Sequence, residues 1–152
     1  MQRNSPSPMA LAIAEAEAAV GRHEVPVGAV LVDGASGEIL ARDHNRVEEL
    51  ADPTAHAELL VIRAAATQLG LKRLTGADLY VTLEPCPMCA QAIAFARLRR
   101  LYFGAYDPKG GGVEHGPRIF EQPTCHHRPE VVGGLEERRC AALLQGFFME
   151  RR

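Results

Sequence analysis

Residues 78–89 read Asp-Leu-Tyr-Val-Thr-Leu-Glu-Pro-Cys-Pro-Met-Cys, and this stretch decides the fold. Its apolar and β-branched beginning predicts a strand over residues 78–83. The pair Cys86-Pro87 then predicts a helix start, with Cys86 as the N-cap and Pro87 at the first helical position. Cys89 follows three residues later and lies on the same helix face. Because a helix N-terminus carries partial positive charge, both cysteines are favoured as thiolates, the form that binds a metal ion.

A second motif lies upstream, Thr54-Ala55-His56-Ala57-Glu58. Asp52-Pro53 predicts another helix start before it, and apolar residues recur at helical spacing up to Gly70. We therefore expect His56 and Glu58 in the first turn of a helix. One imidazole and two thiolates supply three zinc ligands, and a catalytic zinc site leaves the fourth position to water. Glu58 would then be a carboxylate beside that water and not a ligand.

The rest of the chain alternates predicted strands and helices. Strands are expected over residues 25–32, 38–42, 100–104 and 129–132, and helices over residues 8–20, 87–97 and 135–150, with a helical turn near 118–120. Residues 33–37 predict a hairpin turn, and residues 43–53 are expected to be irregular. The alternation favours a single α/β domain over residues 1–152, with a mostly parallel sheet between helices. In such sheets, sites lie at the carboxyl ends of strands, where both motifs fall.

Composition limits the other classes of protein. The net charge of −2 gives no overall basic field of the kind that accompanies nucleic-acid binding. Contacts with phosphates would need local clusters, for which the candidates are Arg97, Arg99, Arg100, Arg151 and Arg152, although a solvated surface is the simpler interpretation of each.

No run of about 20 apolar residues could span a membrane, and the first ten residues lack the apolar core of a signal peptide. We therefore expect a cytoplasmic protein without membrane contact, in which Cys125 and Cys140 are plain thiols.

Together, His-x-Glu and Pro-Cys-x-x-Cys form the known signature of zinc-dependent nucleobase deaminases. Over nearly its whole length, the chain resembles the bacterial tRNA-specific adenosine deaminases of the cytidine-deaminase-like superfamily. Beyond the two motifs, the resemblance is carried by residues 24–30, Asn45, residues 79–86, residues 103–105, Asp107, Lys109, residues 140–144 and Phe147-Phe148.

The resemblance implies a three-layer α/β/α sandwich around a central five-stranded mixed sheet. It implies one zinc ion per chain, bound by His56, Cys86 and Cys89, with Glu58 as the catalytic proton shuttle. The implied reaction is hydrolytic conversion of adenosine to inosine at the wobble position of a tRNA anticodon loop, by a homodimer. Asn45 would hydrogen-bond the target base. The further substrate contacts implied near the anticodon nucleotides are Val27, Asp107, Phe147 and Phe148.

Alternatives stay open at this point. A deaminase of a free nucleobase or nucleotide, of the guanine or cytosine type, would share the zinc site and need no basic rim. A non-enzymatic zinc-stabilised module would leave Glu58 without a reason to lie beside the open position. Asn45 and Asp107 could be turn residues, and Phe147-Phe148 could be core or dimer contacts. The chain also departs from a well-known family member at His23, His44, Tyr106 and residues 110–128.

Overall fold

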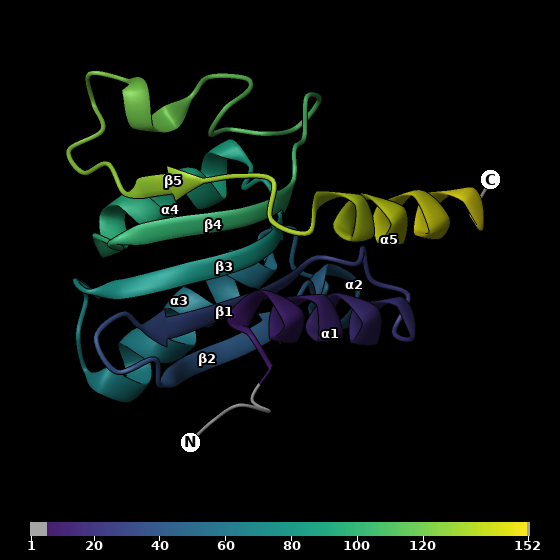
Figure 1. The fold of residues 1–152 in the computed structure, drawn as a ribbon, viewed down its shortest axis with the longest axis horizontal. Helices are drawn as coiled ribbons and strands as arrows, with labels where there is room; N and C mark the ends of the chain where they lie inside the picture. Colours follow the sequence, from purple (N-terminus) through teal and green to yellow (C-terminus); the bar gives the residue numbers. More distant parts are fainter. Residues whose placement is uncertain (1–5, 152) are drawn as a thin grey trace.

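The computed structural model describes residues 6–151, which form one five-stranded sheet with helices on both faces (Figure 1). The strands are β1 (Gly28–Asp33), β2 (Ile39–His44), β3 (Ala77–Leu83), β4 (Arg100–Ala105) and β5 (Glu130–Val132). The helices are α1 (Pro8–Val20), α2 (Val47–Leu50), α3 (Ala57–Leu69), α4 (Pro87–Ala96) and α5 (Glu137–Met149), with a 3-10 turn η1 (Ile119–Glu121). In residues 6–151 no helix is both long and apolar enough to cross a membrane.

The strand order is β2-β1-β3-β4-β5, and the sheet is mixed. β1 is antiparallel to β2 and to β3, whereas β3–β4 and β4–β5 are parallel pairs. The mixed sheet implied by the family resemblance is confirmed. The mostly parallel sheet expected from element alternation holds only for the β3-β4-β5 half, because the tight hairpin between β1 and β2 requires antiparallel pairing.

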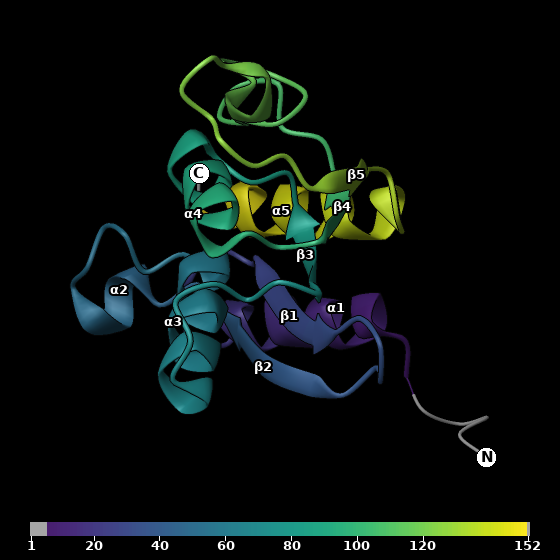
Figure 2. The ribbon, with the colours of Figure 1, turned by 90° about the vertical axis from the view of Figure 1, so that its left-hand side faces the viewer.

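Helices cover the two faces in pairs, giving three layers (Figure 2). α1 and α5 pack on one face, and α3 and α4 lie on the other. The position of β1 between two layers of helices explains the continuous apolar run in its sequence. Ala29 and Leu31 belong to the core under α3 and α4, while Val30 and Val32 belong to the core under α1. A strand buried on both faces needs apolar residues at every position.

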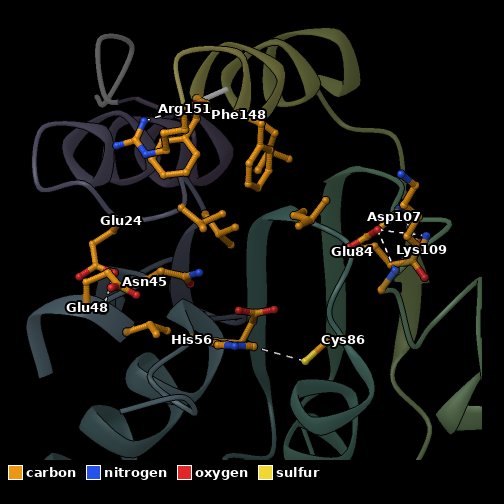
Figure 3. Close-up of a pocket in the computed structure, with 18 of the residues that line it drawn as sticks. Glu24, Asn45, Glu48, His56, Glu84, Cys86, Asp107, Lys109, Phe148 and Arg151 are labelled. Atoms are coloured by element: carbon orange, nitrogen blue, oxygen red, sulfur yellow. Dashed lines mark hydrogen bonds between the residues drawn. The ribbon is translucent and has the colours of Figure 1, made fainter. Parts of the chain in front are cut away.

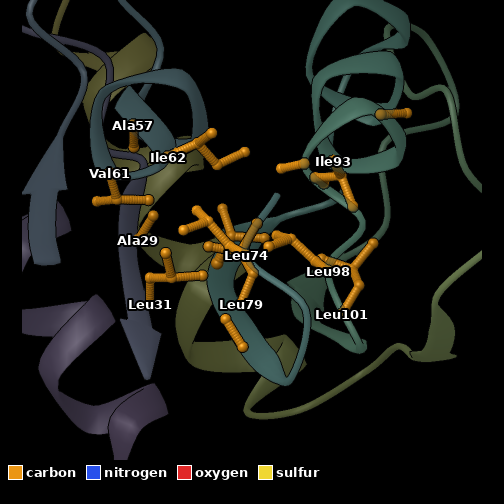
Figure 4. Packing of buried hydrophobic residues seen from close by; sticks show 14 of the residues in the cluster. Ala29, Leu31, Ala57, Val61, Ile62, Leu74, Leu79, Ile93, Leu98 and Leu101 are labelled. Atoms are coloured by element: carbon orange, nitrogen blue, oxygen red, sulfur yellow. The ribbon is translucent and has the colours of Figure 1, made fainter. Parts of the chain in front are cut away.

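The core under α3 and α4 fixes the spacing of those helices (Figure 4). Leu31 and Leu79 from the sheet pack with Val61 of α3 and Ile93 of α4, and all four are fully buried. Burial of each such side chain is worth about 1.5–3 kcal/mol relative to exposure. The shared core therefore holds the amino ends of α3 and α4 at a defined separation.

Gly28 allows α1 to lie directly on the sheet. A Cβ atom at this position would overlap the backbone of Ala12 and lie 2.6 Å from the backbone nitrogen of Ala16. No side chain fits there, which accounts for the glycine in the Val27-Gly28-Ala29 stretch.

Two sequence-based boundaries were wrong. β1 begins at Gly28 and not at Val25, and α3 begins at Ala57 and not at Pro53. The Asp52 carboxylate accepts hydrogen bonds from the backbone nitrogen and the hydroxyl of Thr54, at 2.8 and 2.7 Å, so Asp52 caps a separate turn. His56 is consequently the N-cap of α3. Residues 47–50, expected to be irregular, form the short helix α2.

Candidate active site

The amino ends of α3 and α4 bring three metal-binding side chains together. His56 is the N-cap of α3, Cys86 is the N-cap of α4, and Cys89 lies in the first turn of α4. The His56 Nδ1 atom lies 3.6 Å from Cys86 Sγ (Figure 3). It lies 3.5 Å from Cys89 Sγ. All three donor atoms lie within 4.8 Å of one another.

This spacing fits zinc. Bonds of about 2.3 Å to sulfur and about 2.0 Å to nitrogen that meet at a tetrahedral angle separate the two ligand atoms by about 3.5 Å. The observed His56–sulfur distances of 3.6 and 3.5 Å match that separation. The donor set of one imidazole and two thiols is also one that zinc prefers.

The two sulfurs compete for negative charge. Hydrogen bonds with Cys89 and His56 lower the pKa of Cys86 to about 4, against the effect of burial. The pKa of Cys89 is instead raised far above its ordinary value, because the adjacent Cys86 sulfur and burial both disfavour a second negative charge. A bound divalent cation would compensate both thiolates, so the electrostatics of the pair also suit a metal ion.

Glu58 lies in the first turn of α3 and lines the same cavity as His56 and Cys86. Its side chain is buried. Burial raises the pKa of Glu58 to about 7, with a further contribution from the Cys86 sulfur, against the lowering effect of its own backbone N–H. A carboxyl group with a pKa near neutrality can both accept and return a proton at physiological pH.

Asn45 joins the cavity wall to α3, the helix whose N-cap is His56. Its Oδ1 atom accepts a hydrogen bond of 2.8 Å from the backbone nitrogen of Ala57, the first residue of α3. This contact satisfies one of the free N–H groups of the helix start. Figure 3 shows the nitrogen end of the Asn45 amide directed toward the cavity. The structure thus explains why an amide suits this position: one end anchors it and the other can donate to a ligand.

The cavity has a volume of about 1010 Å³. His56 and Cys86 lie at its base, Asp107 and Lys109 on one side, and Phe148 on α5 above them (Figure 3).

The structure brings the predicted substrate contacts to this one cavity: Val27, Asn45, Asp107, Phe147 and Phe148. The two phenylalanines differ, because Phe147 is 5% exposed and belongs to the core, whereas Phe148 is 51% exposed. Asp107 does act as a turn residue, since its Oδ1 atom accepts hydrogen bonds from the backbone nitrogens of Lys109 and Gly110.

Most of the arginines proposed as phosphate contacts lie away from the cavity. Arg99 and Arg100 lie at the beginning of β4, where they pair with Asp78 and Glu130, whereas the cavity lies at the carboxyl ends of the strands. Arg151 does line the cavity, with its guanidinium 3.5 Å from the ring centre of Phe147. Arg152 lies outside the described residues.

Sequence reasoning missed two buried carboxylates of the cavity wall, Glu24 and Glu84. The Glu24 carboxylate accepts hydrogen bonds from the backbone nitrogens of Glu48 and Glu49, at 3.0 and 2.7 Å, and so holds α2 next to Asn45. Glu84 binds the loop that follows β4. Both acids directly flank an apolar strand sequence, and that position was a signal that each needs a buried partner.

Comparison with known proteins agrees with this geometry. Residues 3–105 match the family described as the cytidine and deoxycytidylate deaminase zinc-binding region. The chain therefore belongs to the zinc-binding deaminases of this family. A tRNA-specific adenosine deaminase of Agrobacterium fabrum is 61% identical over 144 residues, covering 95% of this chain and 93% of the relative. The tRNA-specific adenosine deaminase of Bacillus subtilis is 49% identical over 141 residues, covering 93% and 86%. Within the deaminases, the chain is a member of the tRNA-specific adenosine deaminase family.

Solved structures support the same placement. A structure from a study of A-to-I editing by tRNA:A34 deaminases at the wobble position has a TM-score of 0.87 and 61% identity, covering 90% of this chain and 98% of that chain. A guanine deaminase from Nitrosomonas europaea has a TM-score of 0.76 at 22% identity, covering 94% and 84%. The second likeness shows a common fold alone.

Proposed function

We propose that the chain converts adenosine to inosine at the wobble position of a tRNA anticodon loop. The observation that carries the proposal is the combination of the His56-Cys86-Cys89 cluster and Glu58 at the base of a large open cavity. The relatives named tRNA-specific adenosine deaminases support the choice of substrate.

We further propose that His56, Cys86 and Cys89 hold one zinc ion per chain, with Glu58 as the proton shuttle. When bound at an open site of this kind, zinc lowers the pKa of a water molecule from 15.7 to about 7. Glu58 accepts the proton of the water that attacks C6 of adenine and passes it to a ring nitrogen. A second proton, from the hydroxyl group now bound to C6, then goes through Glu58 to the amino group, which leaves as ammonia while the C6 carbonyl forms. Adenosine and water thus give inosine and ammonia.

The cavity suits a polynucleotide better than a free base. Its volume of about 1010 Å³ lies at the upper end of the range for small-molecule sites, and one base would fill only a part of it. Phe148 offers an exposed aromatic face for stacking of a neighbouring base, an interaction worth about 1–3 kcal/mol per base. Arg151 adds a cation at the same rim.

Assembly as a homodimer in the cytoplasm belongs to the same proposal. Phe95 on α4 is 71% exposed and is therefore available as a contact for a second copy of the chain. A tRNA substrate fits a cytoplasmic enzyme. Sedimentation of the protein at micromolar concentration would show a dimer, and a monomer would contradict this part of the proposal.

Asn45 allows a test of base recognition with two matched variants. Asn45→Asp keeps an acceptor for the Ala57 N–H but loses the donor that faces the cavity, while Asn45→Ala loses both. We expect both variants to lose about 5- to 150-fold in kcat/KM, since one good hydrogen bond to the base is worth about 1–3 kcal/mol. Only Asn45→Ala should also lower the melting temperature. Full activity of Asn45→Asp would exclude the proposed donor role.

The choice between RNA and a free base is tested by a salt series. We expect efficient deamination of an anticodon stem-loop and little of free adenosine, because contacts with remote parts of the substrate position the reacting base. Stem-loop affinity should fall with salt, with a log–log slope of about −0.7 to −0.9 per neutralised phosphate. Ammonia release from the stem-loop, adenosine, guanine and cytosine provides the measurement. Equal efficiency on free bases, or no salt dependence, would favour the free-nucleobase alternative.

A further inference from the structure

We propose that Glu84, together with His115, is a positioning residue that fixes one wall of the substrate cavity. The wall is the segment of residues 107–115, called here the 107–115 loop. Glu84 follows β3 and precedes Cys86 by two residues, and its side chain is fully buried. The inference rests on the proposed function for its activity readout, whereas the contacts themselves are independent of it.

The Glu84 carboxylate accepts five hydrogen bonds from this one loop. Oε1 accepts from the backbone nitrogen of Asp107 at 3.0 Å and from Nδ1 of His115 at 2.8 Å. Oε2 accepts from the backbone nitrogens of Val113, Glu114 and His115 at 3.2, 2.9 and 3.1 Å. The two ends of the loop therefore meet on a single side chain.

The loop closes tightly around this carboxylate. A Cβ atom at Gly111 would overlap Glu84 and lie 2.6 Å from the carbonyl oxygen of Asp107. The backbone nitrogen of Gly112 donates to the carbonyl oxygen of Pro85 at 2.8 Å. The loop is thus tied to the same strand end that carries the metal-binding Cys86.

The opposite side of the loop faces the cavity. Asp107, Lys109 and Gly110 line it. Figure 3 shows Asp107 and Lys109 across the cavity from Asn45. Tyr106, which also lines the cavity, contacts the ring of His115 edge-on, with the ring centres 6.1 Å apart. The places of the Lys109 cation and of the Tyr106 ring beside the substrate therefore depend on a carboxylate that the substrate does not need to touch.

The arrangement requires a carboxylate. Four backbone N–H groups and an imidazole N–H converge on two oxygens, and an amide would present its NH₂ group to some of these donors. Glu84→Gln would therefore leave buried donors without an acceptor and release one end of the loop. His115→Asn is the milder change, because it keeps a nitrogen donor close to the position of Nδ1, whereas His115→Ala removes it.

Glu84→Gln provides the main test. We expect it to keep one zinc per chain but to raise KM for the stem-loop at least about tenfold, with a smaller change in kcat. Amide hydrogen exchange at residues 113–115 should become faster in the free protein. His115→Ala should show both effects more weakly, and His115→Asn should restore values close to the parent.

Asp78→Asn is the matched control. Asp78 is a buried carboxylate at the other end of β3, paired with Arg99 and remote from the cavity. Its replacement should lower the melting temperature without changing KM or loop exchange. The proposal would be overturned if Glu84→Gln lowered the melting temperature without changing KM or loop exchange, as expected for Asp78→Asn. It would also be overturned if Glu84→Gln lost its zinc. If Glu84→Gln does not fold, the two His115 variants decide: the same amide exchange rates and the same KM in His115→Ala and His115→Asn would overturn the proposal.

A parent protein without deaminase activity would instead contradict the proposed function. The exchange data would still decide the role of Glu84.

Discussion

Glu58→Ala is expected to reduce deamination by at least about 10²–10⁴-fold, the usual contribution of a general acid–base group, while zinc remains bound. The loss is large because this one side chain accepts and returns every proton in the proposed reaction. Three of the other carboxylates of the cavity wall already have partners. Glu24, Glu84 and Asp107 are engaged by backbone N–H groups of their own surroundings. Single-turnover kinetics on a stem-loop and zinc analysis of the same sample provide the measurements.

Glu58→Gln is the matched variant, since it keeps the shape of the side chain and removes the titrating group. It should be as inactive as Glu58→Ala. Its melting temperature should equal or exceed that of the parent, because the buried carboxyl group costs stability when it is ionised. Either variant with turnover within about tenfold of the parent would fall short of the expected range and contradict the proton-shuttle role.

Cys86→Ser is expected to lose most of the zinc and to lower the melting temperature strongly. Binding of structural zinc contributes about 10–16 kcal/mol in small zinc-finger peptides at neutral pH, and part of that free energy is folding free energy. Here the cation would join the amino ends of α3 and α4, so its loss should loosen both helix starts. Chelation of zinc from the parent protein should have the same effect.

Cys125→Ser provides the control for that experiment. Cys125 is a free thiol whose sulfur donates to the carbonyl oxygen of His127, and a serine hydroxyl can make the same bond. This variant should keep its zinc and its melting temperature. A full zinc content in Cys86→Ser, measured by elemental analysis, would exclude Cys86 as a ligand.

Short sequence patterns predicted a helix or a strand correctly where the pattern is compatible with only one local structure. Pro87 at the first helical position correctly gave the start of α4, and the apolar stretch correctly gave β3. The equivalent signal at Asp52-Pro53 misled, because the Asp52 carboxylate binds Thr54 in a preceding turn. Two structures can use the same capping residues, and the choice between them depends on contacts that the local sequence does not contain.

The cluster of His56, Cys86 and Cys89 was predictable because metal chemistry restricts both residue type and spacing, and the structure brings these three side chains together. The arginine candidates show the opposite case. Arg99 forms two hydrogen bonds with Asp78, 21 positions away in the sequence, and this pairing depends on the register of β3 beside β4. Charge clusters in a sequence indicate possible partners but not which of them the fold has already used.

The hydrogen bond from Ala57 to Asn45 restricts how a new base preference could be engineered into this enzyme. A substitution that removes the acceptor oxygen of Asn45 also alters the amino end of α3, next to His56, so selectivity and metal retention would change together. Only a short side chain with an acceptor avoids that penalty. Variants with altered selectivity should therefore accumulate at Val27, Tyr106 and Phe148, which line the same cavity without holding the start of α3.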